Sequence, residues 1–249
     1  MVASHILSLL SFGEELVPDT LENIFIPSVL TLTVFFAIFD QGCIKLLCPK
    51  SWFEPYGEAT YWAYVISISY QVCIFIPLGV AVFFLDHNGS YVDLLNSTSH
   101  ETHGKHTILF AFAVLAYMIR DFPNCYYRPL ILFHHIGCVL TTSWVLLEPN
   151  VPVSFFMVST AILEVGSCSN NICFLKPSVS NNLLCSRVFF VGHLVGLLWC
   201  YHTYFYTETS FWFRNLIVPE GLAIMWVRQR VIDKRLAAMQ AEEENKKRT

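Results

Sequence analysis

Two adjacent histidines, His134 and His135, interrupt an otherwise apolar stretch of the sequence. Imidazole changes its charge near neutral pH, so it can act as a base or as a nucleophile. A carboxylate, Asp121, ends the preceding apolar stretch. Ionisable groups among apolar residues are costly to bury in a membrane and are therefore functional candidates.

A polar stripe runs through the apolar stretch that follows the one with the histidine pair. Thr160, Glu164, Ser167 and Asn171 recur at positions i, i+4, i+7 and i+11, which lie on one face of an α-helix. The opposite face is apolar. The stripe must therefore face protein or water and not lipid.

Further polar side chains stand at comparable depths in neighbouring stretches. At roughly 1.5 Å of rise per residue, His134 lies about 9 Å inside the cytosolic end of its helix. We therefore expect one cavity in the cytosolic half of the molecule, although the same residues could also serve as polar contacts between helices, each contributing about 1 kcal/mol. The other expected cavity residues are Tyr117, Arg187, His193 and Glu220.

The composition indicates what kind of fold positions these residues. Of 249 residues, 55% are hydrophobic and 14% are charged, and the mean hydropathy is +0.51. Soluble domains carry about 25% charged residues. A spanning helix needs about 20 apolar residues. The sequence thus predicts an all-α polytopic bundle with seven transmembrane helices, near 23–47, 59–85, 107–122, 128–147, 151–175, 183–206 and 210–227.

The distribution of basic residues predicts the orientation. With a luminal amino terminus and a cytosolic carboxyl terminus, 13 of the 15 lysines and arginines lie in cytosolic segments. Only Lys105 and Arg214 lie on the other side, so the positive-inside rule is strongly obeyed. The predicted parts are a luminal segment 1–22, a membrane bundle 23–227 and a cytosolic tail 228–249. The net charge of −4 gives no indication of nucleic-acid binding.

The longest polar loop, 86–106, falls on the luminal side and contains two glycosylation sequons. Asn96 is the preferred acceptor, because Asn88 lies almost against the membrane. The same loop carries His100, His103 and His106, a run that could bind zinc or copper. We expect a solvated loop without metal.

Three short motifs resemble the TLC-domain family of endoplasmic-reticulum membrane proteins. They are Tyr117 to Asp121, His134-His135, and Glu164-x-x-Ser167 followed by Asn171. The resemblance covers roughly residues 52–229, and Arg187 fits it loosely. It implies a helical bundle around an acyl-lipid cavity in the endoplasmic reticulum.

The family includes ceramide synthases, in which the histidine pair is catalytic. The resemblance implies that His134 and His135 act as base or acyl carrier, that Asp121 tunes them, and that acyl-CoA is the co-substrate, with no resident cofactor. The ceramide-synthase signature continues with a His-Asp dipeptide, which this chain lacks. We therefore predict a protein that binds or modifies an acyl lipid. The alternative is a non-enzymatic lipid sensor or cargo receptor cycling between endoplasmic reticulum and Golgi.

The chain ends with Lys246 and Lys247 at the fourth and third positions from its carboxyl end. This pattern is similar to the dilysine retrieval signal of the endoplasmic reticulum, which vesicle coat machinery reads. The predicted partners are therefore membrane lipid and that coat machinery.

Three other functions of membrane helix bundles are less well supported. A retinal protein needs a lysine in mid-span, and none is present. Nothing in the sequence favours a receptor. Haem could be ligated by histidines from two spans, with His134, His135, His193 and His202 as candidates. Adjacent histidines point about 100° apart, so only one of the pair could serve a given haem.

Overall fold

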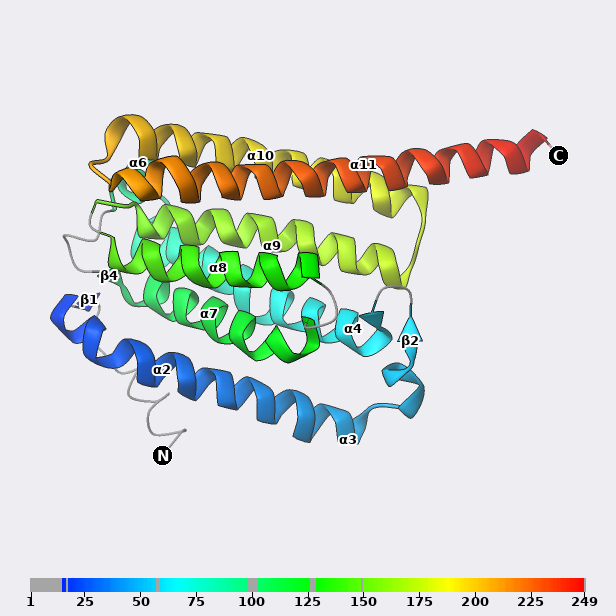
Figure 1. The fold of residues 1–249 in the computed structure, drawn as a ribbon, viewed down its shortest axis with the longest axis horizontal. Helices are drawn as coiled ribbons and strands as arrows, with labels where there is room; N and C mark the ends of the chain where they lie inside the picture. The colour runs from blue at the N-terminus through cyan, green and yellow to red at the C-terminus, as the bar shows by residue number, and fades with distance from the viewer. Residues whose placement is uncertain are drawn as a thin grey trace.

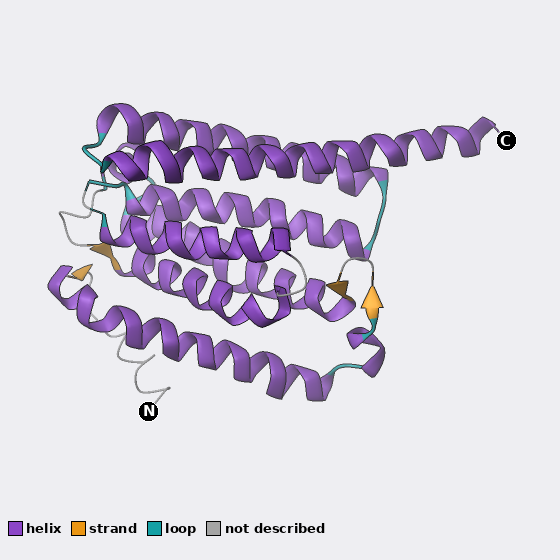
Figure 2. Ribbon diagram, viewed as in Figure 1, coloured by secondary structure: helices purple, strands orange, loops and turns teal. Residues whose placement is uncertain are grey.

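Long helices lying side by side make up nearly all of the computed structural model, as Figures 1 and 2 show. The structure describes residues 15–16, 18–56, 59–97, 103–125, 129–148 and 150–248. Successive long helices run in opposite directions along one axis, and the last helix extends well beyond the others (Figure 1).

Each of the seven apolar stretches is helical in the described chain. The first helices are α2 (Pro18–Ile38) with η1 (Phe39–Ile44) and α3 (Lys45–Leu47), then η2 (Lys50–Phe53), then α4 (Tyr61–Tyr70) with η3 (Gln71–Phe75), α5 (Ile76–Ala81) and η4 (Val82–Asp86). The later helices are α6 (Tyr91–Asn96), α7 (Lys105–Cys125), α8 (Pro129–Leu147), α9 (Val153–Leu175), α10 (Val179–Tyr206), η5 (Phe213–Ile217) and α11 (Val218–Arg248).

Two very short antiparallel pairings lie at opposite ends of the bundle (Figure 1). β1 (Glu15–Leu16) pairs with β4 (His103–Gly104), and β2 (Pro55–Tyr56) pairs with β3 (Ala59–Thr60). Each strand has two residues, so the described chain is a helical bundle, as the sequence predicts.

Four helical segments are long and apolar enough to cross a membrane: Phe25–Gly42, Tyr61–Asp86, Lys105–Pro123 and Val179–Tyr206. This is the pattern of a membrane protein. The apolar part of α8 is shorter, at Ile131–Leu147. α9 carries the polar stripe, and α11 carries charges along most of its length. α8, α9 and α11 all line the site described below.

The packed core is centred on the first two-thirds of α7. Phe110, Phe112 and Leu115 are almost fully buried there, and Phe75 of η3 packs against Phe110. α5 and α9 approach so closely that a Cβ on Gly79 would overlap the Cβ of Ala161. Small residues allow such close contacts between membrane helices.

The predicted cytosolic tail, which begins at residue 228, is helical in the structure. α11 continues without interruption from Val218 to Arg248, because alanine, glutamate, lysine and arginine all favour helix. Lys246 and Lys247 are exposed near its end, and Lys246 Nζ lies 2.6 Å from Glu242 Oε1.

The loop between η4 and α7 contains the sequons. Asn88 and Asn96 are both exposed; Asn88 adopts a positive φ of 50° in the turn after η4, and Asn96 ends α6. His100 and most of the segment 1–22 lie outside the described residues. His106 Nδ1 lies 2.6 Å from Asp86 Oδ1.

Candidate functional site

A cavity of about 1280 Å³ lies at the end of the bundle that contains α3, β2 and the start of α4. Its walls come from α4, α7, α8, α9 and α11, together with Asp40 and Gln41 of η1, Gln71 of η3 and Phe53. The sequence-predicted residues that line it are Tyr117, Asp121, His134, His135, Glu164, Ser167, Asn171 and Glu220.

Three predicted residues lie elsewhere. Thr160 donates a hydrogen bond to the Phe156 carbonyl of its own helix, at 2.9 Å. Arg187 is exposed on α10, where a long basic side chain can reach the polar membrane interface. His193 is buried near Trp226, with ring centroids 6.1 Å apart. Position on a neighbouring helix was thus insufficient to place a residue in the cavity.

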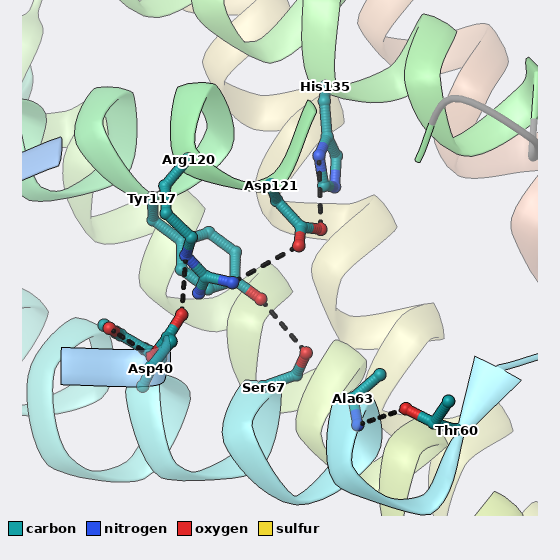
Figure 3. Close-up of polar contacts among 9 residues, drawn as sticks. Asp40, Thr60, Ala63, Ser67, Tyr117, Arg120, Asp121 and His135 are labelled. Atoms are coloured by element: carbon teal, nitrogen blue, oxygen red, sulfur yellow. Dashed lines mark hydrogen bonds and ion pairs between the residues drawn. The ribbon is translucent and has the colours of Figure 1, made fainter. Parts of the chain in front are cut away.

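A chain of charged groups joins η1, α7 and α8 (Figure 3). Arg120 Nε lies 3.0 Å from Asp40 Oδ2, and Arg120 Nη1 lies 3.3 Å from Asp121 Oδ1. Asp121 Oδ2 in turn faces His135 Nδ1 at 3.6 Å. Asp121 therefore stands between a buried arginine and one histidine of the pair.

Aromatic rings surround Arg120. Its Cζ atom lies 4.9 Å from the centroid of the Tyr70 ring and 4.6 Å from that of Tyr117. The Tyr70 hydroxyl donates to Asp40 Oδ1 at 3.0 Å, and the Tyr117 hydroxyl donates to Ser67 Oγ at 3.1 Å. The rings contribute cation–π attraction and hold the guanidinium in place.

Glu164 has a partner that the sequence prediction missed. Gln71 Nε2 donates to Glu164 Oε2 at 2.8 Å, and Asn171 Nδ2 donates to Gln71 Oε1 at 3.3 Å. One amide thus bridges Glu164 and Asn171 of the polar stripe on α9. A signal was present, since Gln71 is the only amide in the apolar stretch 59–85.

α11 contributes two arginines that the sequence prediction assigned to a polar tail. Arg228 Nη2 lies 3.3 Å from Ser167 Oγ. Arg235 Nε and Nη2 donate to Asn182 Oδ1 at 2.6 Å and to Asn170 Oδ1 at 2.7 Å. The lining residues of α11 recur with helical spacing, at 220, 223, 224, 227, 228, 231, 232 and 235, so one face of this helix lines the cavity.

His134 has a different environment from His135. Its ring nitrogens lie 3.7 Å from Cys138 Sγ, one helical turn further along α8. His193 and His202, the other haem candidates, are not among the residues that line the cavity. The cavity therefore brings together two of the four candidate histidines, both from α8.

The chemistry available follows from the Asp121–His135 arrangement. A carboxylate beside Nδ1 favours the tautomer that carries its proton on Nδ1, so Nε2 becomes the basic nitrogen. The Asp40–Arg120–Asp121 chain keeps that carboxylate in place. The site can therefore support proton transfer or nucleophilic attack by imidazole.

Comparison with protein-family models, with curated proteins and with solved structures finds no match to this chain. The arguments about function consequently depend on the motifs and on the geometry of the cavity.

Proposed function

We propose that the protein is an endoplasmic-reticulum membrane protein of the TLC type that binds an acyl lipid in this cavity and transfers an acyl group with its histidine pair. In this proposal all seven apolar helices cross the membrane, with the amino terminus in the lumen and the carboxyl terminus in the cytosol. The excess of basic residues in the segments assigned to the cytosol supports this orientation.

The observation that carries the proposal is the combination of a polar floor and an apolar rim in one cavity. Asp121, His135 and Glu164 form part of the floor, whereas Phe133, Val227 and Val231 line the cavity and are also exposed on the outside. An amphipathic molecule fits such a site, because its chain can stay against apolar side chains while its polar group meets the charged ones.

The proposed reaction uses imidazole as the acyl carrier. A histidine nitrogen attacks the carbonyl carbon of an acyl thioester, the carbon–sulfur bond breaks, and the thiolate leaves and takes up a proton. A hydroxyl or amine of the acceptor then attacks the acyl-imidazole, loses its proton and restores the histidine. Asp121 stabilises the positive charge that develops on His135 during the first step.

The test is the direct detection of an acylated histidine. Purified protein is incubated with a long-chain acyl thioester, and the α8 peptide is analysed by mass spectrometry. We expect an added acyl mass on the peptide that contains His134 and His135, lost in His135→Asn and strongly reduced in Asp121→Asn. An unmodified peptide in a folded protein that still contains lipid would contradict the transfer step.

A second candidate function is lipid sensing without catalysis, and the continuity of α11 favours it. One helix carries Arg228 in the cavity wall and Lys246 at the exposed end. Lipid occupancy could thereby influence the segment that coat machinery would read. In this case His135→Asn changes which lipids co-purify, and no acylated peptide forms.

A further inference from the structure

The cavity face of α11 presents two positive charges. Arg228 and Arg235 are separated by seven residues, which is two turns, so both point from the same side of the helix. Arg228 is partly buried against Phe189, with Cζ 5.1 Å from the ring centroid. Arg235 Cζ lies 4.7 Å from the centroid of the Phe174 ring.

Neutral oxygens supply the hydrogen-bond contacts of both guanidinium groups. Ser167 contacts Arg228, and Asn170 and Asn182 contact Arg235. Within the described ranges, neither arginine forms an ion pair with a carboxylate. Glu164 acts on Arg228 through space, but its carboxylate accepts from Gln71.

Of the other acids that line the cavity, Glu220 lies eight residues before Arg228 on α11, or about 12 Å along the helix axis. Asp40 and Asp121 both pair with Arg120. Ser167 and Asn170, which contact the two arginines, are three residues apart on α9, or about 4.5 Å along the helix axis. Both guanidinium groups thus lie on the wall of one cavity, where an anion beside them would offset their positive charge.

The planar guanidinium group of arginine suits a phosphate better than a point charge would. Its planar fork can give two parallel hydrogen bonds to a phosphate, and it is the preferred residue for that group at partly buried sites. The neutral partners fix both forks without neutralising them. Such an arrangement is preorganised for an anionic ligand.

The apolar side chains at the rim of the cavity indicate what the ligand must contain besides a phosphate. Val227 and Val231 alternate with the arginines on α11 and are 59% and 61% exposed. Phe133 faces the cavity from α8 and is 74% exposed. These apolar side chains both line the cavity and face outward, so a hydrocarbon chain can lie along them between the cavity and the bilayer.

We propose that the cavity selects lipids whose polar group contains a phosphate and carries a net negative charge, with Arg228 and Arg235 binding the phosphate and the α8–α11 rim holding the hydrocarbon chain. This inference rests on the proposed function, since it names the class of lipid for the same cavity. A phosphate can come from a membrane phospholipid with a net negative headgroup or from the coenzyme part of an acyl thioester. Both sources present the same oxygens to the arginines.

The experiment measures lipid selectivity in nanodiscs or mixed micelles. The full-length protein is exchanged into phosphatidylcholine containing a minor share of phosphatidic acid, and bound lipids are counted by native mass spectrometry. We expect preferential retention of phosphatidic acid, reduced by about tenfold for each guanidinium that is removed, which corresponds to about 1.4 kcal/mol. The variants are Arg228→Gln and Arg235→Gln, alone and combined.

A matched control is present on the same helix. Arg230 and Lys234 are exposed and do not line the cavity. Arg230→Gln combined with Lys234→Gln removes the same charge from the surface of α11 and should leave selectivity unchanged. Equal losses in both double variants would overturn the proposal, because general attraction to the membrane surface would then explain the preference.

Further measurements distinguish the two sources of the phosphate, and they distinguish phosphate selectivity from lipid binding itself. Palmitoyl-CoA added to the mixture of phosphatidylcholine and phosphatidic acid tests the thioester. If it displaces phosphatidic acid, and Arg228→Gln removes this competition, both ligands use one phosphate site. Arg228→Lys and Arg235→Lys, which keep charge but lose the fork, should retain intermediate selectivity and report on folding. Failure of the wild type to retain any lipid would remove the proposed function itself, whereas retention without arginine-dependent selectivity would remove only this inference.

Discussion

The two ends of α7 differ in what surrounds them. From Ile108 to Ala116 every side chain except Leu109 is buried, and the neighbours are apolar, as with Phe75 against Phe110. From Tyr117 to Asp121 the same helix borders a cavity and carries a buried arginine between two carboxylates. One helix thus passes from a close-packed core into a polar site within about two turns.

The difference shows what stabilises each region. The packed end is stabilised by volume fit, so changes of side-chain size should be costly there. The cavity end is stabilised by partners, because a buried charge without a partner is expensive. Added volume should therefore be the most damaging change at the packed end. Loss of a charged partner should be the most damaging change at the cavity end.

The largest effect is expected for Arg120→Ala. The change leaves Asp40, which is 4% exposed, without its counter-charge, and breaking a buried pair costs about 3–5 kcal/mol. We expect a large fall in thermal stability in detergent. Arg187→Ala, at an exposed arginine of α10, is the control and should change stability by less than about 0.5 kcal/mol. Equal effects would contradict the comparison.

A smaller effect is expected for added volume in the packed end. Gly79→Ala puts a methyl group where the Cβ of Ala161 already lies, and overpacking of this kind costs about 1–3 kcal/mol. Gly221→Ala is the matched control, because no atom lies within 4 Å of its added Cβ. It should be neutral or slightly stabilising, since alanine favours helix over glycine. A reversed order in thermal unfolding would refute the close approach of α5 and α9.

The two ends should also face different compartments. We expect a glycan on Asn96, at the end of the bundle opposite the cavity, and a shift in electrophoretic mobility on endoglycosidase treatment that Asn96→Gln abolishes. Asn88→Gln should have little effect, because Asn88 lies only two residues after the end of η4. In intact microsomes, protease should remove the end of α11, and a protected tail would reverse the proposed orientation.

The smallest structural effect is expected at the tail. Lys246→Ser with Lys247→Ser leaves the bundle untouched, since both residues are exposed beyond it. We expect the protein to move toward later secretory compartments, as seen by glycan maturation and by microscopy. Lys234→Ser is the control. Unchanged retention would mean that the spans or a partner hold the protein in the endoplasmic reticulum.

The length of the apolar stretches was sufficient to predict the helices, and the stripe on α9 was sufficient to predict that Glu164, Ser167 and Asn171 share a face. Partners across helices were not predictable. Gln71 meets Glu164 only because η3 packs beside α9. Arg228 and Arg235 were assigned to a tail, because a charged segment alone does not reveal that one of its faces lines a cavity. Arg187 and His193 were predicted to line the cavity and do not, because a position within an apolar stretch does not determine which way a side chain points.

The measurement that tests the central claim most directly is the amount of lipid held by a protein whose cavity is filled. Val227 and Val191 are both exposed valines, on α11 and α10, but only Val227 lines the cavity. Val227→Trp and Val191→Trp therefore add the same bulk inside and outside the site. Bound acyl lipid is counted by mass spectrometry after purification of both variants and the wild type. We predict that Val227→Trp loses most of the bound lipid at unchanged thermal stability, while Val191→Trp retains it. Equal lipid in all three proteins would contradict the claim that this cavity is the lipid site.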